Sequence, residues 1–229
     1  MDSFRKGNQP KPRNQGQIYR DFQILMFLYY ANQALENYGF LSMYKYLNSD
    51  DAKKKTFRGE LEENKIYMKF KQKLKDLVGS LAVGSGGHPK FERCRKICVE
   101  HLKNSPSSRI IIFSKIRDSV NELVSVLNSG ARNIAARAFV GQGKGGGSRK
   151  AGINQNDQVA LLEEFRAGGF NVLVATCVGE EGLDIGNVEM VICFDSSTSS
   201  TSLVQRMGRT GRKGDGKVVV IISAGKEYE

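Results

Sequence analysis

The chain has 229 residues, of which 40% are hydrophobic and 26% charged, the balance of a globular protein with one or two domains. The formal net charge of +11 favours a polyanionic partner, nucleic acid first and an anionic membrane surface second, with a merely basic protein as the open alternative. No apolar run reaches the roughly 18 residues that a membrane span needs, and the polar, basic beginning of the chain predicts no signal peptide. Four scattered cysteines do not make a disulfide framework, which favours a reducing compartment.

The first part of the chain has a helical pattern. Residues 1–17 combine prolines and glycines with positive charge, which is typical of a linker or tail. The stretch DFQILMFLYYANQALENY (21–38) has apolar residues on nearly every face and predicts a buried helix. A short helix (40–47), a charged loop (50–60), a third helix and a fourth helix that begins at Pro89 follow. We therefore expect an all-helical unit over residues 18–103.

The pattern changes at residue 104, where short apolar strands begin to alternate with helices. Strands are expected at 109–113, 137–140, 171–176, 190–195 and 217–223. Their apolar cores are continuous, which is typical of parallel strands covered by helices on both faces of a sheet. Residues 104–229 are therefore expected to form an α/β domain.

The glycine-rich stretch GQGKGGGSRKAG (141–152) follows one of these strands and formally satisfies G-x-G-x-x-G. A dinucleotide fingerprint must open directly into a helix, and the next helix begins too late, near Asn154. A flexible loop is therefore the plain interpretation, and no G-x-x-x-x-G-K-[ST] phosphate loop occurs anywhere in the sequence. As a basic loop, it is a candidate to contact a phosphodiester backbone through Lys144, Arg149 and Lys150.

Cys94, Cys98 and His101 recur on one face of the fourth helix, at a spacing that suits a metal ion. No fourth ligand is evident, and free cysteines commonly act as small buried hydrophobic residues. We therefore expect no metal site in this chain.

Two further segments carry candidate chemistry. TCVGEEGLDIG (176–186) begins where a strand ends, which is where open α/β sheets bind ligands, although an acidic surface turn is the plain alternative. In QRMGRTGRKG (205–214), Arg206, Arg209 and Arg212 alternate with glycines. This stretch is a solvated basic turn, a nucleic-acid clamp, or a set of arginine fingers that neutralise a transferring phosphoryl group. The glycines favour the interpretation as arginine fingers, because a backbone without side chains can lie close to another surface.

Together these segments resemble a known family. RIIIFSKIRDSV, NVLVATCVGEEGLDIGNV and LVQRMGRTGRKG, in that order, resemble motifs IV, V and VI of the second RecA-like domain of superfamily 2 helicases. The amino-acid sequence of these motifs is most similar to that of the Fanconi anaemia group M/Hef branch-point translocases. The preceding helices resemble the helical insertion of that family. The resemblance implies an ATP-dependent enzyme that remodels forked or branched DNA in repair, in the nucleus and with possible repair-complex partners.

The resemblance also implies roles for single residues on the nucleotide side. Arg209 and Arg212 match the arginines that reach the ATP γ-phosphate, and Gln205 matches the polar residue at the head of the same motif. Asp184 matches a carboxylate near the ribose, with Gly182 in the tight turn beside it. Because the chain has no phosphate loop, ATP and Mg²⁺ are expected to be held mainly by a first RecA-like domain. The chain would then be a fragment that does not hydrolyse ATP alone.

On the nucleic-acid side, Thr176 and Ser114 match positions that contact phosphates of the tracked strand. Two alternatives remain open at this point. RNA-sensing and Dicer-type helicases carry helical insertions in the same position, which makes an RNA helicase one rival. A non-catalytic nucleic-acid-binding module is the other, although a scaffold has no need of intact motif VI arginines.

Overall fold

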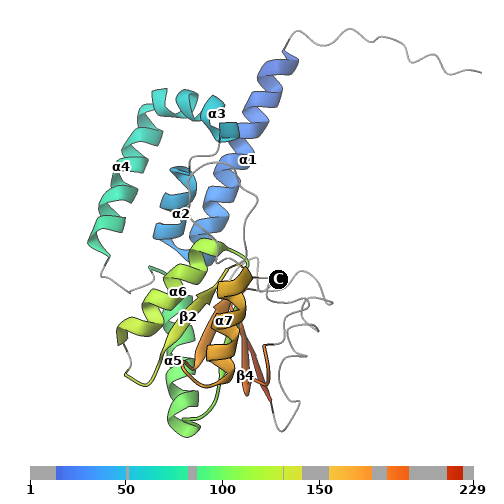
Figure 1. The fold of residues 1–229 in the computed structure, drawn as a ribbon. Helices are drawn as coiled ribbons and strands as arrows, with labels where there is room; N and C mark the ends of the chain where they lie inside the picture. Colours follow the sequence, from blue (N-terminus) through green and yellow to red (C-terminus); the bar gives the residue numbers. More distant parts are fainter. Residues whose placement is uncertain are drawn as a thin grey trace, which may run out of the picture.

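The computed structural model describes residues 14–49, 52–81, 87–130, 132–140, 155–176, 185–195 and 216–223, with the backbone alone at 52–56 and 155. Within these residues, four helices come first, followed by an α/β part in which five short strands alternate with three helices (Figure 1). The helices are α1 (Gln15–Tyr38), α2 (Phe40–Leu47), α3 (Ala52–Glu63), α4 (Lys65–Ser80), α5 (Pro89–Asn104), α6 (Arg117–Gly130) and α7 (Gln155–Arg166). The strands are β1 (Ile110–Phe113), β2 (Ala136–Phe139), β3 (Val172–Ala175), β4 (Met190–Cys193) and β5 (Lys217–Val220).

Helices α1 to α4 pack around a small apolar core. Phe27 from α1 lies against Tyr46 of α2 and Phe57 of α3, with ring centroids 5.4 and 5.2 Å apart. Leu47 and Leu74 complete the contact between α2 and α4. None of the helices in the described part of the chain is long and apolar enough to cross a membrane.

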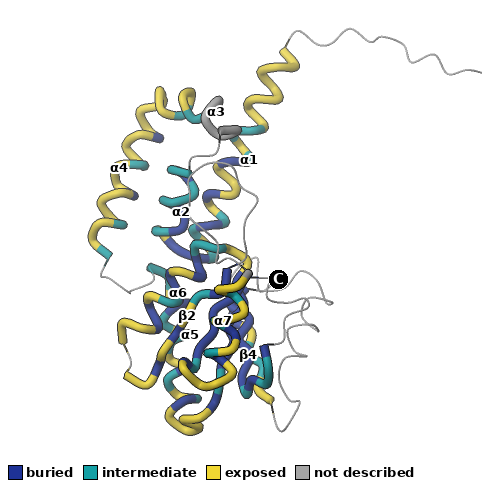
Figure 2. The backbone as a smooth tube through the Cα atoms, viewed as in Figure 1, coloured by how far each residue is buried: buried dark blue, intermediate teal, exposed yellow. Residues whose placement is uncertain are grey.

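Two predictions about this helical part were wrong. Residues 52–63 form α3 and not a charged loop, because Ala, Lys and Glu are strong helix formers whatever their charge. The prediction that residues 21–38 form a buried helix also fails: α1 buries one face, while Phe22 and Leu25 on the rest of it are 56% and 62% exposed. Figure 2 shows the end of α1 farthest from the sheet as almost wholly exposed.

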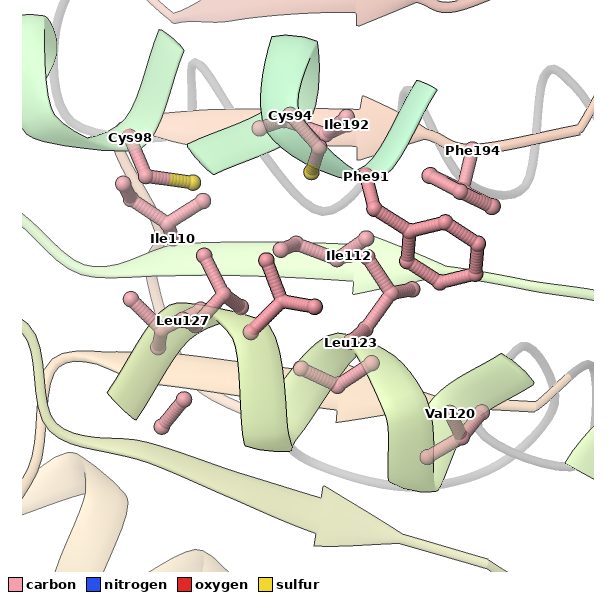
Figure 3. Packing of buried hydrophobic residues seen from close by; sticks show 14 of the residues in the cluster. Phe91, Cys94, Cys98, Ile110, Ile112, Val120, Leu123, Leu127, Ile192 and Phe194 are labelled. Carbon is pink, nitrogen blue, oxygen red and sulfur yellow. The ribbon is translucent and has the colours of Figure 1, made fainter. Parts of the chain in front are cut away.

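The α/β part contains a parallel sheet with the strand order β2-β3-β1-β4-β5. Alternate residues of β1 enter two separate cores, because successive side chains of a strand point to opposite faces. Ile110 and Ile112 meet α5 and α6, and Figure 3 shows both helices packed on that face of the sheet. Ile111 and Phe113 face α7 on the other side. The expected RecA-like arrangement, with helices on both faces, is therefore present.

Helix α5 packs with the sheet, although the sequence pattern placed it in the helical unit. Its side chains Phe91, Cys94 and Cys98 are fully buried against β1 and β4. Pro89 occupies its first turn as predicted, and the side chain of His88 accepts a hydrogen bond from the backbone N–H of Lys90. The boundary at residue 104 stays a prediction, and we propose that the two units divide ahead of α5.

The end of α1 nearest the sheet connects the two parts. Tyr38 is buried in the same cluster as Phe91 and stacks on Phe194, with ring centroids 6.4 Å apart. Gly39 then turns the chain into α2 with a φ of 86°. A Cβ atom at this glycine would lie 2.7 Å from the carbonyl oxygen of Gly87, so a larger residue would push α1 away from the start of α5.

Candidate functional site

Three polar residues follow three neighbouring strands at the carboxyl edge of the sheet. Ser114 comes after β1, and Thr176 and Asp195 lie beyond the ends of β3 and β4 on either side of it. The register holds them at one level: the Ser114 amide donates to the Ala175 carbonyl, and the Phe194 amide donates to the Phe113 carbonyl, both at 2.9 Å. Open α/β sheets bind their ligands at this edge.

Asp195 is the centre of a buried hydrogen-bond network. Its Oδ2 accepts from the Ser114 hydroxyl at 2.9 Å and from the Lys115 amide at 2.6 Å. The Ser119 hydroxyl lies 2.6 Å from both the Ser114 hydroxyl and the Ile116 carbonyl oxygen. Each hydroxyl has a single proton, so when Ser114 donates to Asp195, Ser119 can donate either to the Ile116 carbonyl or to Ser114, but not to both at once. The network therefore ties the end of β4 to the turn between β1 and α6.

The other oxygen of Asp195 is less well satisfied. Asp195 is 1% exposed, and its Oδ1 has no hydrogen-bond partner within the described residues. A buried carboxylate oxygen without a donor is costly, so this atom has unused capacity to accept a hydrogen bond at the candidate site. No role was predicted for Asp195, although a carboxylate directly after a buried strand was the available signal.

The two predicted phosphate contacts that lie in this region differ in accessibility. Thr176 is at the limit of burial, with 9% of its surface exposed, and its amide donates to the Phe139 carbonyl at 3.3 Å. Ser114 is fully buried, and its hydroxyl is engaged by Asp195 and Ser119. The edge thus brings both residues together, with Thr176 nearer to solvent.

The remaining predicted site residues lie outside the described residues. The chain passes into these segments after Val140, Thr176 and Asp195, which all follow strands at the carboxyl edge. The residues concerned are Lys144, Arg149, Lys150, Gly182, Asp184, Gln205, Arg209 and Arg212.

The cysteines of α5 belong to the core. Cys94 and Cys98 are fully buried and point toward Ile110 and Ile112 (Figure 3). A hydrogen bond with Cys98, together with burial, raises the pKa of the Cys94 thiol well above its usual range, which disfavours the thiolate that a metal requires. Among the residues that the structure describes, no group of three His, Cys, Asp or Glu side chains is placed to hold a metal ion.

Comparison with known proteins places this edge in a family. A family model, the helicase conserved C-terminal domain, matches residues 89–214, a range that includes every predicted site residue from Ser114 to Arg212. The Fanconi anemia group M protein homolog of Mus musculus is 36% identical over 255 residues, covering 99% of this chain and 12% of that protein. The DEAD-box ATP-dependent DNA helicase Fancm of Drosophila melanogaster is 44% identical over 144 residues, covering 62% of this chain and 10% of that protein. The chain thus spans only a small part of the length of these relatives.

A solved structure supports the same grouping. The crystal structure of the Pyrococcus furiosus Hef helicase domain superposes with a TM-score of 0.66 at 30% identity. The superposition covers 94% of this chain and 43% of that chain, so it includes the helical part as well as the sheet.

Proposed function

The chain belongs to the helicase conserved C-terminal domain family, and within it to the superfamily 2 helicases of the Fanconi anaemia group M and Hef type. We propose that it is part of an ATP-dependent DNA translocase. In that enzyme it is the second RecA-like domain together with a helical insertion, and the enzyme remodels forked or branched DNA in repair. The observation that carries the proposal is the family match over residues 89–214, which includes both the carboxyl edge of the sheet and the QRMGRTGRKG stretch.

On the nucleotide side, the proposal assigns the γ-phosphate to Arg209 and Arg212, and the link between nucleotide and DNA to Gln205. The proposal also assigns the ribose to Asp184, with Gly182 as the glycine of the same motif. The sequence has no G-x-x-x-x-G-K-[ST] loop, so the β- and γ-phosphates and Mg²⁺ are assigned to a first RecA-like domain. The planar guanidinium groups of these arginines supply positive charge, which stabilises the negative charge that develops on the phosphoryl group during its transfer.

On the DNA side, Thr176 and the basic residues Lys144, Arg149 and Lys150 contact backbone phosphates. The buried hydroxyl of Ser114 acts instead as a positioning group, because it holds Asp195 and the turn before α6. This assignment replaces the predicted phosphate contact of Ser114, because its hydroxyl is fully buried.

The outer face of α4 adds a second basic surface. Lys65, Lys69, Lys73 and Lys75 are exposed on this helix, while Tyr67 and Leu74 anchor its inner face. Such a face, on a chain with a net charge of +11, fits the grip of the helical insertion on duplex DNA near a branch point.

The α4 surface is tested by the double substitution Lys69→Ala and Lys73→Ala, with Lys103→Ala on α5 as the control. Junction affinity should fall, and the slope of log K against log salt should decrease by about two if both lysines contact phosphates. An unchanged salt slope contradicts this part of the proposal.

The substrate is tested by the ATP turnover of the full-length protein with forked DNA, duplex RNA and no nucleic acid. Forked DNA should stimulate turnover most, whereas preferential stimulation by duplex RNA would identify an RNA helicase. No turnover with any nucleic acid would identify a non-catalytic binding module. This 229-residue chain alone should show no turnover above background.

The proposed setting is the nucleus, where the enzyme would act with other repair proteins. Imaging of the tagged full-length protein before and after DNA damage tests this setting, and an exclusively cytoplasmic signal contradicts it.

A further inference from the structure

A cavity of about 580 Å³ lies at the amino edge of the sheet, opposite the edge that holds Ser114 and Asp195. It is lined by three loops, residues 106–109 before β1, 132–135 before β2, and 166–171 before β3. In a parallel sheet, the loops that precede the strands share the amino edge, so the fold itself brings these segments together. No residue assigned to ATP or DNA lines this cavity.

Hydrogen bonds between the loops shape the cavity in advance. Asn171 connects two of them: its Oδ1 accepts from the Ala135 amide at 2.9 Å, and its Nδ2 donates to the Asn133 carbonyl at 2.8 Å. The third loop is joined by Arg109, whose Nη1 donates to the Arg166 carbonyl at 3.0 Å. The lining is therefore held without a ligand, which lowers the cost of ordering it on binding.

The lining is strongly positive. It contains Arg109, Arg132 and Arg166 and no carboxylate. The nearby Glu189 accepts from the Arg109 amide at 2.7 Å and is not part of the lining. Arg132 is exposed and makes no hydrogen bond or ion pair with any other described residue, so its guanidinium is available to a ligand.

The rest of the lining suits a peptide. Pro106, Ala135 and Ala167 present exposed apolar surface, with the buried side chains of Ile134 and Phe170 behind them. A bare phosphate would leave this apolar surface unused, and a nucleic-acid duplex is too wide for a cavity of this size. A peptide that alternates acidic and small apolar side chains matches both parts, because arginine pairs with carboxylates through two parallel hydrogen bonds.

We propose that this cavity is a docking site for an acidic peptide segment of a partner protein. A carboxylate of the peptide pairs with Arg132, in the positive surroundings of Arg109 and Arg166, and its apolar side chains contact Pro106 and Ala135. The site faces away from the carboxyl edge, so a partner held here leaves that edge free. The volume is within the range of specific ligand sites, roughly 300–1,000 Å³.

The test measures the binding of a short fluorescein-labelled peptide of Asp, Glu and Ala to the 229-residue chain by fluorescence anisotropy at physiological salt. The matched control peptide replaces Asp and Glu by Asn and Gln. Arg132→Glu is compared with Arg93→Glu on α5, which makes the same charge change on an exposed arginine outside the cavity. Thermal unfolding of both variants checks that they remain folded.

The acidic peptide should bind at least about tenfold tighter than the amide peptide, and Arg132→Glu should weaken it about tenfold while Arg93→Glu changes it less than about twofold. Equal binding of both peptides, or equal losses in both variants, overturns the proposal. Displacement of the peptide by a single-stranded oligonucleotide, in a manner that depends on Arg132, also overturns it and reassigns the cavity to nucleic acid. None of these readouts depends on ATP turnover, so the docking site and the proposed enzyme function can fail separately.

Discussion

The sheet of the α/β part and helix α1 of the helical part bury their apolar residues to very different degrees. All four residues of β1 are fully buried, and they enter cores on both faces of the sheet. In α1, by contrast, Ile18, Phe22 and Leu25 are 61%, 56% and 62% exposed. These α1 residues recur at spacings of four and three and so share one face of the helix. The difference indicates that the centre of the sheet, at β1, has a complete core within the described residues, whereas α1 presents an apolar face that these residues do not cover.

The largest effect is expected from a leucine-to-alanine substitution, which removes three side-chain carbon atoms, made once in the α/β part and once in the helical part. Leu123→Ala opens a cavity beneath β1, because Leu123 of α6 is fully buried, and should lower the free energy of unfolding by about 2–5 kcal/mol. Leu25→Ala on the exposed face of α1 should change it by less than about 0.5 kcal/mol. Urea unfolding followed by circular dichroism measures both. Similar losses in the two variants would mean that α1 is covered in solution.

A second test concerns a buried acid of α6. Glu122 is 6% exposed, and neither carboxylate oxygen has a hydrogen-bond partner in the described part of the chain. Burial raises the pKa of Glu122 from 4.5 to about 7; Lys45 of α2 opposes this effect, and Asp118 adds to it. The folded state then keeps a proton that the unfolded state has released, so stability should fall as pH rises from about 4.5 to about 7.

Glu122→Gln removes this titration and should flatten that part of the stability profile. Above pH 7 the variant should be more stable than the parent by up to about 3 kcal/mol, the upper limit set by the shift in pKa. Thermal unfolding at a series of pH values measures this. If the variant and the parent lose stability in parallel over this range, Glu122 is not the group responsible.

A smaller loss of stability than at Leu123 or Glu122 is expected at the start of α4. The Asn64 side chain accepts hydrogen bonds from the amides of Ile66 and Tyr67, at 2.9 and 3.2 Å, and so caps the helix. Asn64→Ala should cost about 1 kcal/mol, and Asn64→Asp should preserve the cap. If the helical part opens separately, hydrogen exchange in α4 should rise about fivefold while β1 keeps its protection. Equal acceleration in β1 would show that the two parts unfold as one unit.

The sequence predicted the strands well and the helical part less well. Continuous runs of β-branched residues such as Ile110–Ile112 strongly favour a buried strand. The positions expected for the strands agree closely with β1 to β5. In residues 52–63 the density of charge suggested a loop, while the intrinsic propensity of the same residues favoured the helix that forms. The exposure of α1 could not be predicted, because the pattern of a helix does not say whether partners are present.

The candidate site at the carboxyl edge was only partly predictable for a similar reason. Ser114 and Thr176 were identified from motifs that lie along the sequence. The buried pairing of Ser114 with Asp195 joins residues 81 positions apart, and at the opposite edge of the sheet the link from Asn171 to Ala135 spans 36 positions. Such contacts depend on the order of strands in the sheet, which local periodicity does not determine.

The central proposal is that the α/β part supplies arginine fingers to an ATPase that another domain completes. Arg212→Ala in the full-length protein tests this proposal most directly. DNA-stimulated ATP turnover should fall by about 10³-fold or more, and Arg212→Lys should not restore it, because an ammonium group lacks the planar fork. Affinity for forked DNA and the thermal stability of the 229-residue chain should stay nearly unchanged. Turnover within a few-fold of the parent in Arg212→Ala would contradict the account.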